Sequence, residues 1–579
     1  MLRNHYKLPH IEKRLLPNIW DGLVLMIVMA VIASLAWGAM DMDVPYQFGT
    51  VISISLDPSH LPGYAVSTVI RMLLALMVSF IFTLTISTLA AKSDAAAKII
   101  LPALDILQSI PILGLLSITV VGFIALFPDS RLGPECAAIF AIFTSQVWNM
   151  AFSFYQSLRS IPKEWQEAAA IYHLSPWQRF WHIEVPFATP GLLWNTMVSM
   201  SAGWFYVVAS EAISVANTTI TLPGIGSYIS KAIWQGDSKA IGYAIFAMFL
   251  VILIYDQLLF RPLLKWAETF KPDTLEGETS TPSWFYDLLT KTRLFKYLSV
   301  IYQPLIEFFI NPPRFTRTKP AYKTSLPSPK LARWGRYAFN TLTALSLLWA
   351  MKVLCDFMIA EITMDEAFWV LWLGLITGVK VMVLIVLASL VWVPLGVYIG
   401  MRPNAAQICQ PIAQFLAAFP ANLLYPLVVI LIVKYHLNIN IWTMPLMILG
   451  TQWYILFNVI AGTSALPQEL HLAIQNFGVS GWLKWKRLIL PAIFPYYVTG
   501  AMTAAGGAWN ASIVAEVVEW DGQRLTAQGL GRYITEFSDQ GDFPRIALGI
   551  TVMCIYVLVL NHVLWRKLYR IAENRFTLE

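Results

Sequence analysis

The sequence predicts an all-α polytopic membrane protein with about twelve transmembrane helices, arranged as two parallel repeats of about six. Three observations support this fold class: the composition, the long apolar stretches and an internal repeat. Of the 579 residues, 57% are apolar and only 13% are charged, and the mean hydropathy is +0.61. Soluble domains carry about 45–50% apolar and about 25% charged residues, so half the charge of a water-facing surface is missing.

The apolar stretches are long enough to cross a bilayer, since a spanning helix needs about 20 residues. We expect spans near 20–39, 64–91, 99–127, 134–157, 184–210, 240–260, 338–360, 367–400, 409–433, 438–462, 489–515 and 545–565. Most of the 40 Lys and Arg residues then fall in loops on one side, together with both termini. Because basic loops stay on the inner side, both termini are predicted to be cytoplasmic.

The second half of the chain repeats the first. A shift of 305 positions aligns 162–268 with 467–573 and pairs Trp177 with Trp482, and a shift of 309 pairs Pro111 with Pro420. Since each half holds an even number of spans, the halves share one orientation and are related by an axis along the membrane normal. The predicted organisation is a first half at 1–268, a cytoplasmic Pro-rich basic linker at 269–336 and a second half at 337–579.

Two long loops, 161–186 and 466–491, occupy equivalent places on the predicted cytoplasmic side. In the first loop, Pro162 suits the first turn of a helix, and Ser175 followed by Pro176 is typical of the start of a second one. In the second loop, Gly478 is expected at the turn and Ser480 at the cap. Each loop is therefore predicted to be a helix, a turn and a helix, ending where a proline opens the next span.

These loops resemble the signature of the permease subunits of binding-protein-dependent ABC importers, which is Glu-Ala-Ala, three residues, Gly, and a Pro about 13 positions later. The matching or replacing positions are Glu167, Ala168, Ala169, His173 (in place of Gly) and Pro186 in the first loop, and Leu472 (in place of Glu), Ala473, Gly478 and Pro491 in the second. The flanking segments look most like the nitrate/sulfonate/taurine-type branch, with two permease domains fused in one chain.

The resemblance implies two repeats of the type I ABC importer permease fold in a bacterial inner membrane. It further implies a transport component, not an enzyme, whose loops dock on two separate cytoplasmic ATPase subunits. Those subunits would hold ATP and Mg, and an extracytoplasmic binding protein would deliver a small anionic solute. The residues agree on one point: no Gly-Lys dipeptide occurs, so the chain has no phosphate-binding loop and no cofactor of its own.

Four charged residues are predicted within spans or at their ends, at matched depth: Arg71, Glu211, Lys380 and Glu516. Arg71 is expected to pair with Glu211 and Lys380 with Glu516, or the pairing is crossed. These four charges have three interpretations: structural pairing, contact with an anionic substrate near the outer gate, or snorkelling to headgroups.

The solute pathway is expected between the halves, along the fifth span of each. Its candidate residues are Ser201, Trp204, Tyr206, Gly506, Trp509, Asn510 and Ser512. Close helix packing explains the small residues as well as a pore does. The polar segments 211–239 and 516–544 are expected either to fold back at the outer face, where the family meets its binding protein, or to form plain loops.

Two other classes of protein were weighed. A secondary transporter with 6+6 parallel repeats is the alternative, but its acidic or His relay near the span centres is missing. A membrane enzyme would gather His, Asp or Glu at one face, whereas the eight His are scattered. The four cysteines form no Cys-x-x-Cys pair, so we predict neither a metal site nor a disulfide.

Overall fold

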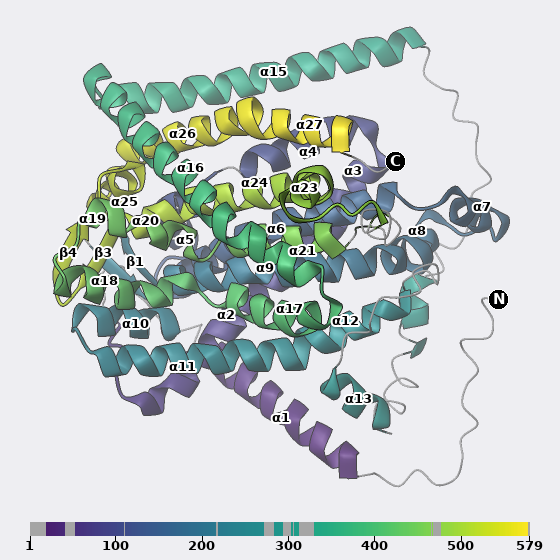
Figure 1. Cartoon of the computed structure of the whole chain (residues 1–579), viewed down its shortest axis with the longest axis horizontal. Coiled ribbons are helices and arrows are strands. Elements are labelled where there is room, and N and C mark those ends of the chain that lie inside the picture. Colours follow the sequence, from purple (N-terminus) through teal and green to yellow (C-terminus); the bar gives the residue numbers. More distant parts are fainter. Residues whose placement is uncertain are drawn as a thin grey trace. The chain divides into compact units, whose positions relative to one another are not determined.

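The computed structural model describes residues 19–40, 52–108, 110–215, 218–270, 283–292, 303–304, 306–311, 329–464, 466, 470 and 476–576, and these are largely helical (Figure 1). The first half and the linker contain α1 (Ile19–Met40), η1 (Pro58–His60), α2 (Leu61–Phe82), η2 (Thr83–Ser87), α3 (Thr88–Lys92), α4 (Asp94–Leu107), α5 (Ile112–Leu126), α6 (Leu132–Arg159), α7 (Lys163–Ile171), α8 (Pro176–Arg179), η3 (Phe180–Glu184), α9 (Val185–Glu211), β1 (Ala212–Val215), β2 (Thr218–Thr221), α10 (Ile225–Trp234), α11 (Ser238–Tyr255), η4 (Asp256–Phe260), α12 (Arg261–Ala267), η5 (Glu268–Phe270) and α13 (Trp284–Lys291).

The second half follows the same order of elements. It contains α15 (Pro329–Ile359), α16 (Met364–Gly400), α17 (Pro403–Ala418), η6 (Ala421–Leu424), α18 (Tyr425–Lys434), α19 (Ile439–Trp442), α20 (Met444–Leu449), α21 (Trp453–Ser464), α23 (Gly481–Lys484), η7 (Trp485–Ile489), α24 (Leu490–Ala515), β3 (Val517–Trp520), β4 (Gln523–Thr526), α25 (Leu530–Gln540), α26 (Phe543–Leu560), η8 (Asn561–Trp565) and α27 (Arg566–Phe576). The chain is therefore an all-α membrane protein built from two repeats. Each repeat also contains one short β-hairpin.

Six helical runs of the described residues are long and apolar enough to cross a membrane, or eight if two bent pairs each count as one span. The expected spans at 20–39, 99–127, 184–210 and 338–360 are also helical, but they are shorter, broken or less apolar. Three expected spans are not single straight helices. Those at 99–127, 409–433 and 438–462 are each interrupted.

Two equivalent prolines cause equivalent interruptions. Pro111 precedes α5 with φ −70° and ψ 108°, and Pro420 precedes η6 with φ −66° and ψ 112°. A proline has no backbone N–H and disfavours helical conformation in the residue before it, so the helix stops there. In the second half, the chain bends by 83° at this point. A further 47° bend between α20 and α21 has no counterpart in α6, which is continuous over 28 residues.

The two long loops differ from the prediction at their final prolines. Pro186 and Pro491 do not open a separate span, because α8, η3 and α9 run on continuously, as do α23, η7 and α24. The segments η3 and η7 are π-helical, and each ends two residues before the proline. The wider π turn accommodates a residue that cannot donate to the carbonyl four positions earlier.

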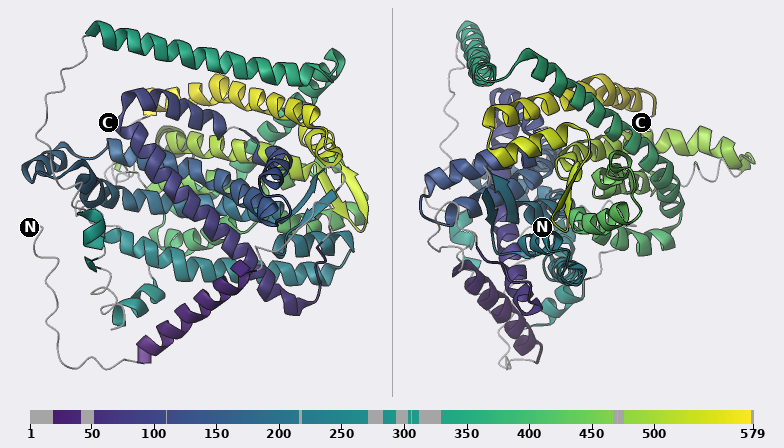
Figure 2. Two further views of the ribbon diagram at one scale, coloured as in Figure 1. Left: turned by 180° about the vertical axis from the view of Figure 1, so that it is seen from behind. Right: turned by 90° about the vertical axis from the view of Figure 1, so that its left-hand side faces the viewer.

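The polar segments after the fifth helices fold back as β-hairpins followed by short helices. β1 pairs with β2 from Ala212↔Thr221, and β3 pairs with β4 from Val517↔Thr526, which is the same register in both repeats. Asp521 and Gly522 have φ of 50° and 69°, as the two-residue turn of a hairpin requires. The two hairpins gather at one end of their compact unit (Figures 1 and 2).

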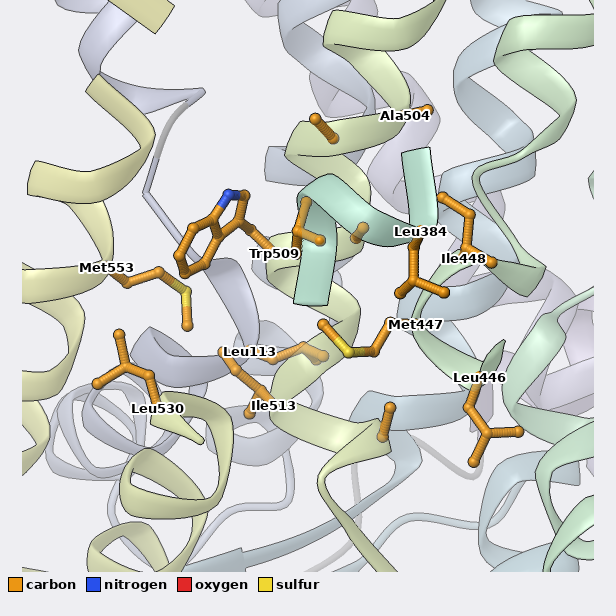
Figure 3. Close-up of a cluster of buried hydrophobic side chains, with 14 of the residues drawn as sticks. Leu113, Leu384, Leu446, Met447, Ile448, Ala504, Trp509, Ile513, Leu530 and Met553 are labelled. Atoms are coloured by element: carbon orange, nitrogen blue, oxygen red, sulfur yellow. The ribbon is translucent and has the colours of Figure 1, made fainter. Parts of the chain in front are cut away.

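The chain forms two compact units, which do not coincide with the two repeats. Unit 1 comprises Met1–Trp37, Gln156–Trp194 and Ile254–Thr324, and unit 2 comprises Gly38–Tyr155, Asn195–Leu253 and Ser325–Glu579. The sequence-based boundaries 1–268, 269–336 and 337–579 stay a prediction. Unit 2 holds the main core, in which Leu113 of the first repeat joins Leu384, Trp509 and Ile513 of the second (Figure 3).

In unit 1, the linker helix α13 packs within the protein. Its Phe285 and Leu288 are buried together with Val24 of α1, and Lys265 lies 2.6 Å from Asp287. Part of the apolar side of α13 is therefore covered by protein, while Trp284 stays 55% exposed.

Candidate functional site

A cavity of about 260 Å³ lies in unit 2, between helices of both repeats. Its wall combines aromatic side chains, which include Trp148 and Trp565, with hydroxyl and amide side chains such as Thr144 and Asn510. None of the described residues that line it is charged. Trp148 Nε1 and Thr451 Oγ1 are buried lining atoms without a hydrogen-bond partner in the described structure. An unsatisfied buried polar group costs about 1–3 kcal/mol.

The lining is built from repeat-equivalent residues. The pairs are Gln108 with Ala417, Ile112 with Ala421, Ser145 with Gly450, Asn149 with Tyr454, Ser201 with Gly506 and Phe205 with Asn510. Because equivalent residues of both repeats line the cavity, it lies on the axis that relates the two repeats. We name it the inner cavity.

A second cavity of about 310 Å³ lies against the β-hairpins, and we name it the outer cavity. Its lining includes the repeat-equivalent pairs Leu113 with Asn422, Leu116 with Tyr425, Val208 with Ile513, Ile213 with Val518, Ile229 with Ile534 and Ser230 with Thr535. The two cavities therefore follow one axis through unit 2.

Five of the seven predicted pathway residues line the inner cavity: Ser201, Tyr206, Gly506, Trp509 and Asn510. Trp204 and Ser512 do not line it, and the assignment of all seven to a solute pathway stays a prediction. The lining positions on α9 are Ser201, Ala202, Phe205 and Tyr206, which form one helical face, and Trp204 lies on another. Ser512 is buried, and its Oγ donates to the Trp509 carbonyl at 2.7 Å.

Helix ends meet the opposite repeat beside the inner cavity. The Ile112 N–H, at the start of α5, donates to Asn510 Oδ1 of the second repeat at 3.0 Å. In the reverse sense, Asn422 Nδ2 of the second repeat donates to the Phe205 carbonyl of the first at 3.3 Å. The breaks at Pro111 and Pro420 thus free backbone donors, and Asn510 satisfies one of them.

The structure pairs the four intramembrane charges directly, without crossing. Arg71 Nη1 lies 2.7 Å from Glu211 Oε1, and Lys380 Nζ lies 3.1 Å from Glu516 Oε1. All four side chains are buried, and none lines either cavity. This placement favours structural pairing over snorkelling or contact with substrate.

Each carboxylate also collects hydrogen bonds from the helix that follows its hairpin. Glu211 accepts from the Gly226 N–H at 2.6 Å and from Thr68 Oγ1 at 2.7 Å. Glu516 accepts from the Arg532 N–H at 3.2 Å and from Thr377 Oγ1 at 3.1 Å. The two threonines are equivalent at the 309 shift, a signal that the sequence contained and that was missed.

Glycines let the chain approach these carboxylates. A Cβ atom at Gly224 would overlap the Glu211 carboxylate, and one at Gly529 would overlap that of Glu516. The repeated Gly-x-Gly segments are thus explained by close packing against a buried anion.

Glu135 is a further partner that the sequence analysis missed. Its oxygens accept from Arg71 Nε at 2.6 Å and from Nη2 at 2.8 Å, which is a bidentate pairing. The 305 shift places Asn440 at the equivalent position. The first repeat therefore carries a guanidinium between two carboxylates, and the second an ammonium opposite one.

The first long loop has the predicted helices. Pro162 caps α7, and Ser175 caps α8 in a capping box with Gln178. Glu167 is exposed on α7, Ala168 is partly buried and Ala169 is buried. His173 has φ of 50° and Gly478 has φ of 65°, so the two residues occupy equivalent left-handed turns. Ala473 and Leu472 lie outside the described residues.

The linker contacts this first loop within unit 1. The ring of Phe309 lies 5.4 Å from that of Trp177 and 5.3 Å from that of Trp181, and Trp177 Nε1 donates to the Phe309 carbonyl at 3.0 Å. Gln178 Nε2 donates to Asn311 Oδ1 at 2.7 Å. We name this set of contacts the linker clamp.

The second loop cannot form the same clamp. Lys486 replaces Trp181, Leu483 replaces Gln178, and Trp482, the counterpart of Trp177, is 73% exposed.

Comparison with known proteins agrees with this architecture. Residues 83–259 and 392–576 each match the family described as "Binding-protein-dependent transport system inner membrane component". The matched segments cover more than half of the chain, which therefore belongs to this family and carries its domain twice.

Individual relatives are permeases of this kind. The chain is 27% identical over 121 residues to the bicarbonate transport system permease protein CmpB of Synechocystis sp., covering 21% of the chain and 41% of the relative. It is 26% identical over 157 residues to the nitrate import permease protein NrtB of Leptolyngbya laminosa, covering 27% and 51%. It is 24% identical over 183 residues to the taurine transport system permease protein TauC of Escherichia coli, covering 31% and 62%. The chain thus spans about half the length of these relatives.

Removing a buried cation should destabilise the protein. We expect Lys380→Met to lower the free energy of unfolding by about 3–5 kcal/mol, because Glu516 is left buried without its cation. Arg71→Met should cost more, because Glu211 loses its cation and Glu135 keeps only the longer contact with Arg131, whose Nε lies 3.6 Å away. The exposed pair of Arg532 and Glu536 supplies the control, since Arg532→Met should cost at most about 1 kcal/mol. Thermal unfolding of the detergent-purified variants measures this order, and equal losses in all three would contradict it.

Removing one clamp tryptophan should release the linker segment. We expect Trp177→Ala to speed amide hydrogen exchange of residues 306–311 roughly tenfold, since each lost ring contact is worth about 0.5–1.5 kcal/mol. Trp482→Ala is the matched control and should leave that exchange unchanged. Equal exchange in both variants would show that the clamp does not hold the linker.

Proposed function

We propose that this chain forms the whole transmembrane pathway of an ATP-driven importer for a small oxyanion-bearing solute. A separate extracytoplasmic binding protein delivers the solute beside the β-hairpins, and two separate cytoplasmic ATPase subunits hold ATP and Mg. The observation that carries the proposal is the pair of cavities whose walls come in repeat-equivalent pairs from both halves. A route on the axis of a fused pair of domains needs no second permease chain.

The chemistry of the inner cavity suits transient binding of such a solute. Its hydroxyl, amide and indole groups can donate to oxyanion oxygens, while a fixed cation would hold the solute too tightly to pass it on. Bicarbonate, nitrate and taurine, for which the relatives are named, all carry oxyanion oxygens.

The loops suit ATPase docking, with Glu167, Ala168, Ala169, His173 and Pro186 in the first and Ala473, Gly478 and Pro491 in the second. At the end of α7, Ile171 is 75% exposed and Tyr172 is 63% exposed. Apolar side chains presented by a short helix fit a groove on a partner. We further propose that the loops and both termini face the cytoplasm, as the distribution of Lys and Arg predicts.

The secondary-transporter alternative needs a titratable relay. Glu135, Glu211 and Glu516 are each held by a cation, and no described carboxylate lines the inner cavity. The structure therefore favours coupling to an external ATPase.

Reconstitution tests the proposal. We expect proteoliposomes containing one copy of the chain with its ATPase and binding protein to import nitrate, bicarbonate or taurine only with ATP. The chain alone should hydrolyse none. Uptake driven by an ion gradient without any ATPase would overturn the proposal in favour of a secondary transporter, and two permease chains per complex in native mass spectrometry would contradict the single-copy pathway.

Filling the inner cavity should block that uptake. A side chain at Gly506 meets open space, so Gly506→Leu should narrow the cavity without disturbing the backbone. We expect import to fall at least about tenfold while the unfolding temperature stays within the range of a surface change. Gly242→Leu is the matched control, because Gly242 also faces open space but lies outside the lining. Equal import by both variants would show that the solute does not pass through the inner cavity.

A further inference from the structure

One residue borders both cavities. Among the described lining residues, Tyr425 is the one shared by the inner and the outer cavity. It is only 5% exposed, so its side chain is packed within the protein where the two hollows share it. It begins α18, a few residues after the helix break at Pro420.

The tyrosine is held by a single polar contact to a neighbouring helix. Its hydroxyl donates to the Leu446 carbonyl of α20 at 2.9 Å. α20 ends three residues later, at the 47° bend that leads to α21. The ring is therefore attached to two short helical pieces, each bounded by a break, and such pieces can move as units.

The first repeat places a smaller residue at the equivalent position. Leu116 corresponds to Tyr425 at the 309 shift, and it lines the outer cavity but not the inner one. The residue that borders both cavities thus comes from one repeat only. Two tyrosines related by the axis would compete for the same place.

We propose that Tyr425 is the gate between the outer and inner cavities, closed when its hydroxyl binds the Leu446 carbonyl and open when its ring turns aside. The inference deepens the proposed transport function and rests on it. As a gating residue, Tyr425 decides when a solute in the outer cavity reaches the hydroxyl and amide groups of the inner one.

Cysteine accessibility tests the gate without knowledge of the solute. The full-length chain is prepared with Cys136, Cys355, Cys409 and Cys554 replaced by alanine. Ser201→Cys then reports on the inner cavity and Ser230→Cys on the outer one. A membrane-impermeant methanethiosulfonate reagent is added on the side of the β-hairpins, and labelling rates are measured.

The expected result is selective. Ser201→Cys should label about 10- to 100-fold faster after Tyr425→Ala, because a closed gate leaves an open minority of about 1–10%. Tyr425→Phe keeps the ring but loses the hydroxyl and should give an intermediate rate, which keeps the test informative if Tyr425→Ala folds poorly. Leu116→Ala, the matched control, should leave the rate at Ser201→Cys unchanged, and Ser230→Cys should label readily in every variant.

Two outcomes overturn the gate: the same rate at Ser201→Cys with and without Tyr425→Ala and Tyr425→Phe, or an equal rise with Leu116→Ala. The result is independent of reconstituted import. A chain that gates labelling through Tyr425 but does not import with ATP would keep the gate and overturn the importer. If the chain imports with ATP but the labelling rate does not depend on Tyr425, the importer is kept and the gate is overturned.

Discussion

In each repeat, a buried ion pair joins the second long helix, α2 or α16, to the C-terminal end of α9 or α24, and it constrains the hairpin and the helix that follow. Glu211 and Glu516 are taken out of water within apolar surroundings, and a carboxylate there is tolerated only when a cation and several donors surround it. The backbone N–H donors come from the start of the helix after each hairpin, and the hydroxyl donors Thr68 and Thr377 come from α2 and α16. The hairpin must therefore turn back sharply onto the membrane domain, which forms the wall of the outer cavity. The glycines beside each carboxylate follow from the same requirement for close approach.

The repeats share most of their backbone features, although the π turn η2 and the bend between α20 and α21 each occur in one repeat only. Equivalent prolines break equivalent helices, and π segments recur at the same offset, η3 with η7 and η4 with η8. The hairpins keep one register. On this common skeleton, one repeat carries a guanidinium with two carboxylates and the other an ammonium with one. The backbone of the two repeats is therefore largely equivalent, whereas their buried charges are not.

Periodicity and the internal repeat were enough to predict the helical class, the doubled architecture, the four paired charges and most of the lining of the inner cavity. What they could not supply depends on contacts between distant segments. Glu135 has no charged counterpart in the second repeat, so no comparison of the halves singles it out. Trp204 and Ser512 lie on the two helices that line the inner cavity, but their side chains are on other faces of those helices. The docking of Phe309 onto Trp177 joins residues 132 positions apart, and no local pattern indicates it.

Fusion into one chain explains how the asymmetry can exist. If two identical subunits formed the pathway, every substitution would appear twice around the axis, and a bulky ring on the axis would meet its own copy. A fused chain can place Tyr425 opposite Leu116, so that a single ring fills the axis. The same reasoning applies to the linker clamp, which holds the first loop through Trp181 while Lys486 stands in the second. Loops that differ in this way cannot present identical surfaces to whatever binds them. A fused chain of this family is therefore free to give its two halves different contacts, and Tyr425 and Trp181 are two places where this chain has done so.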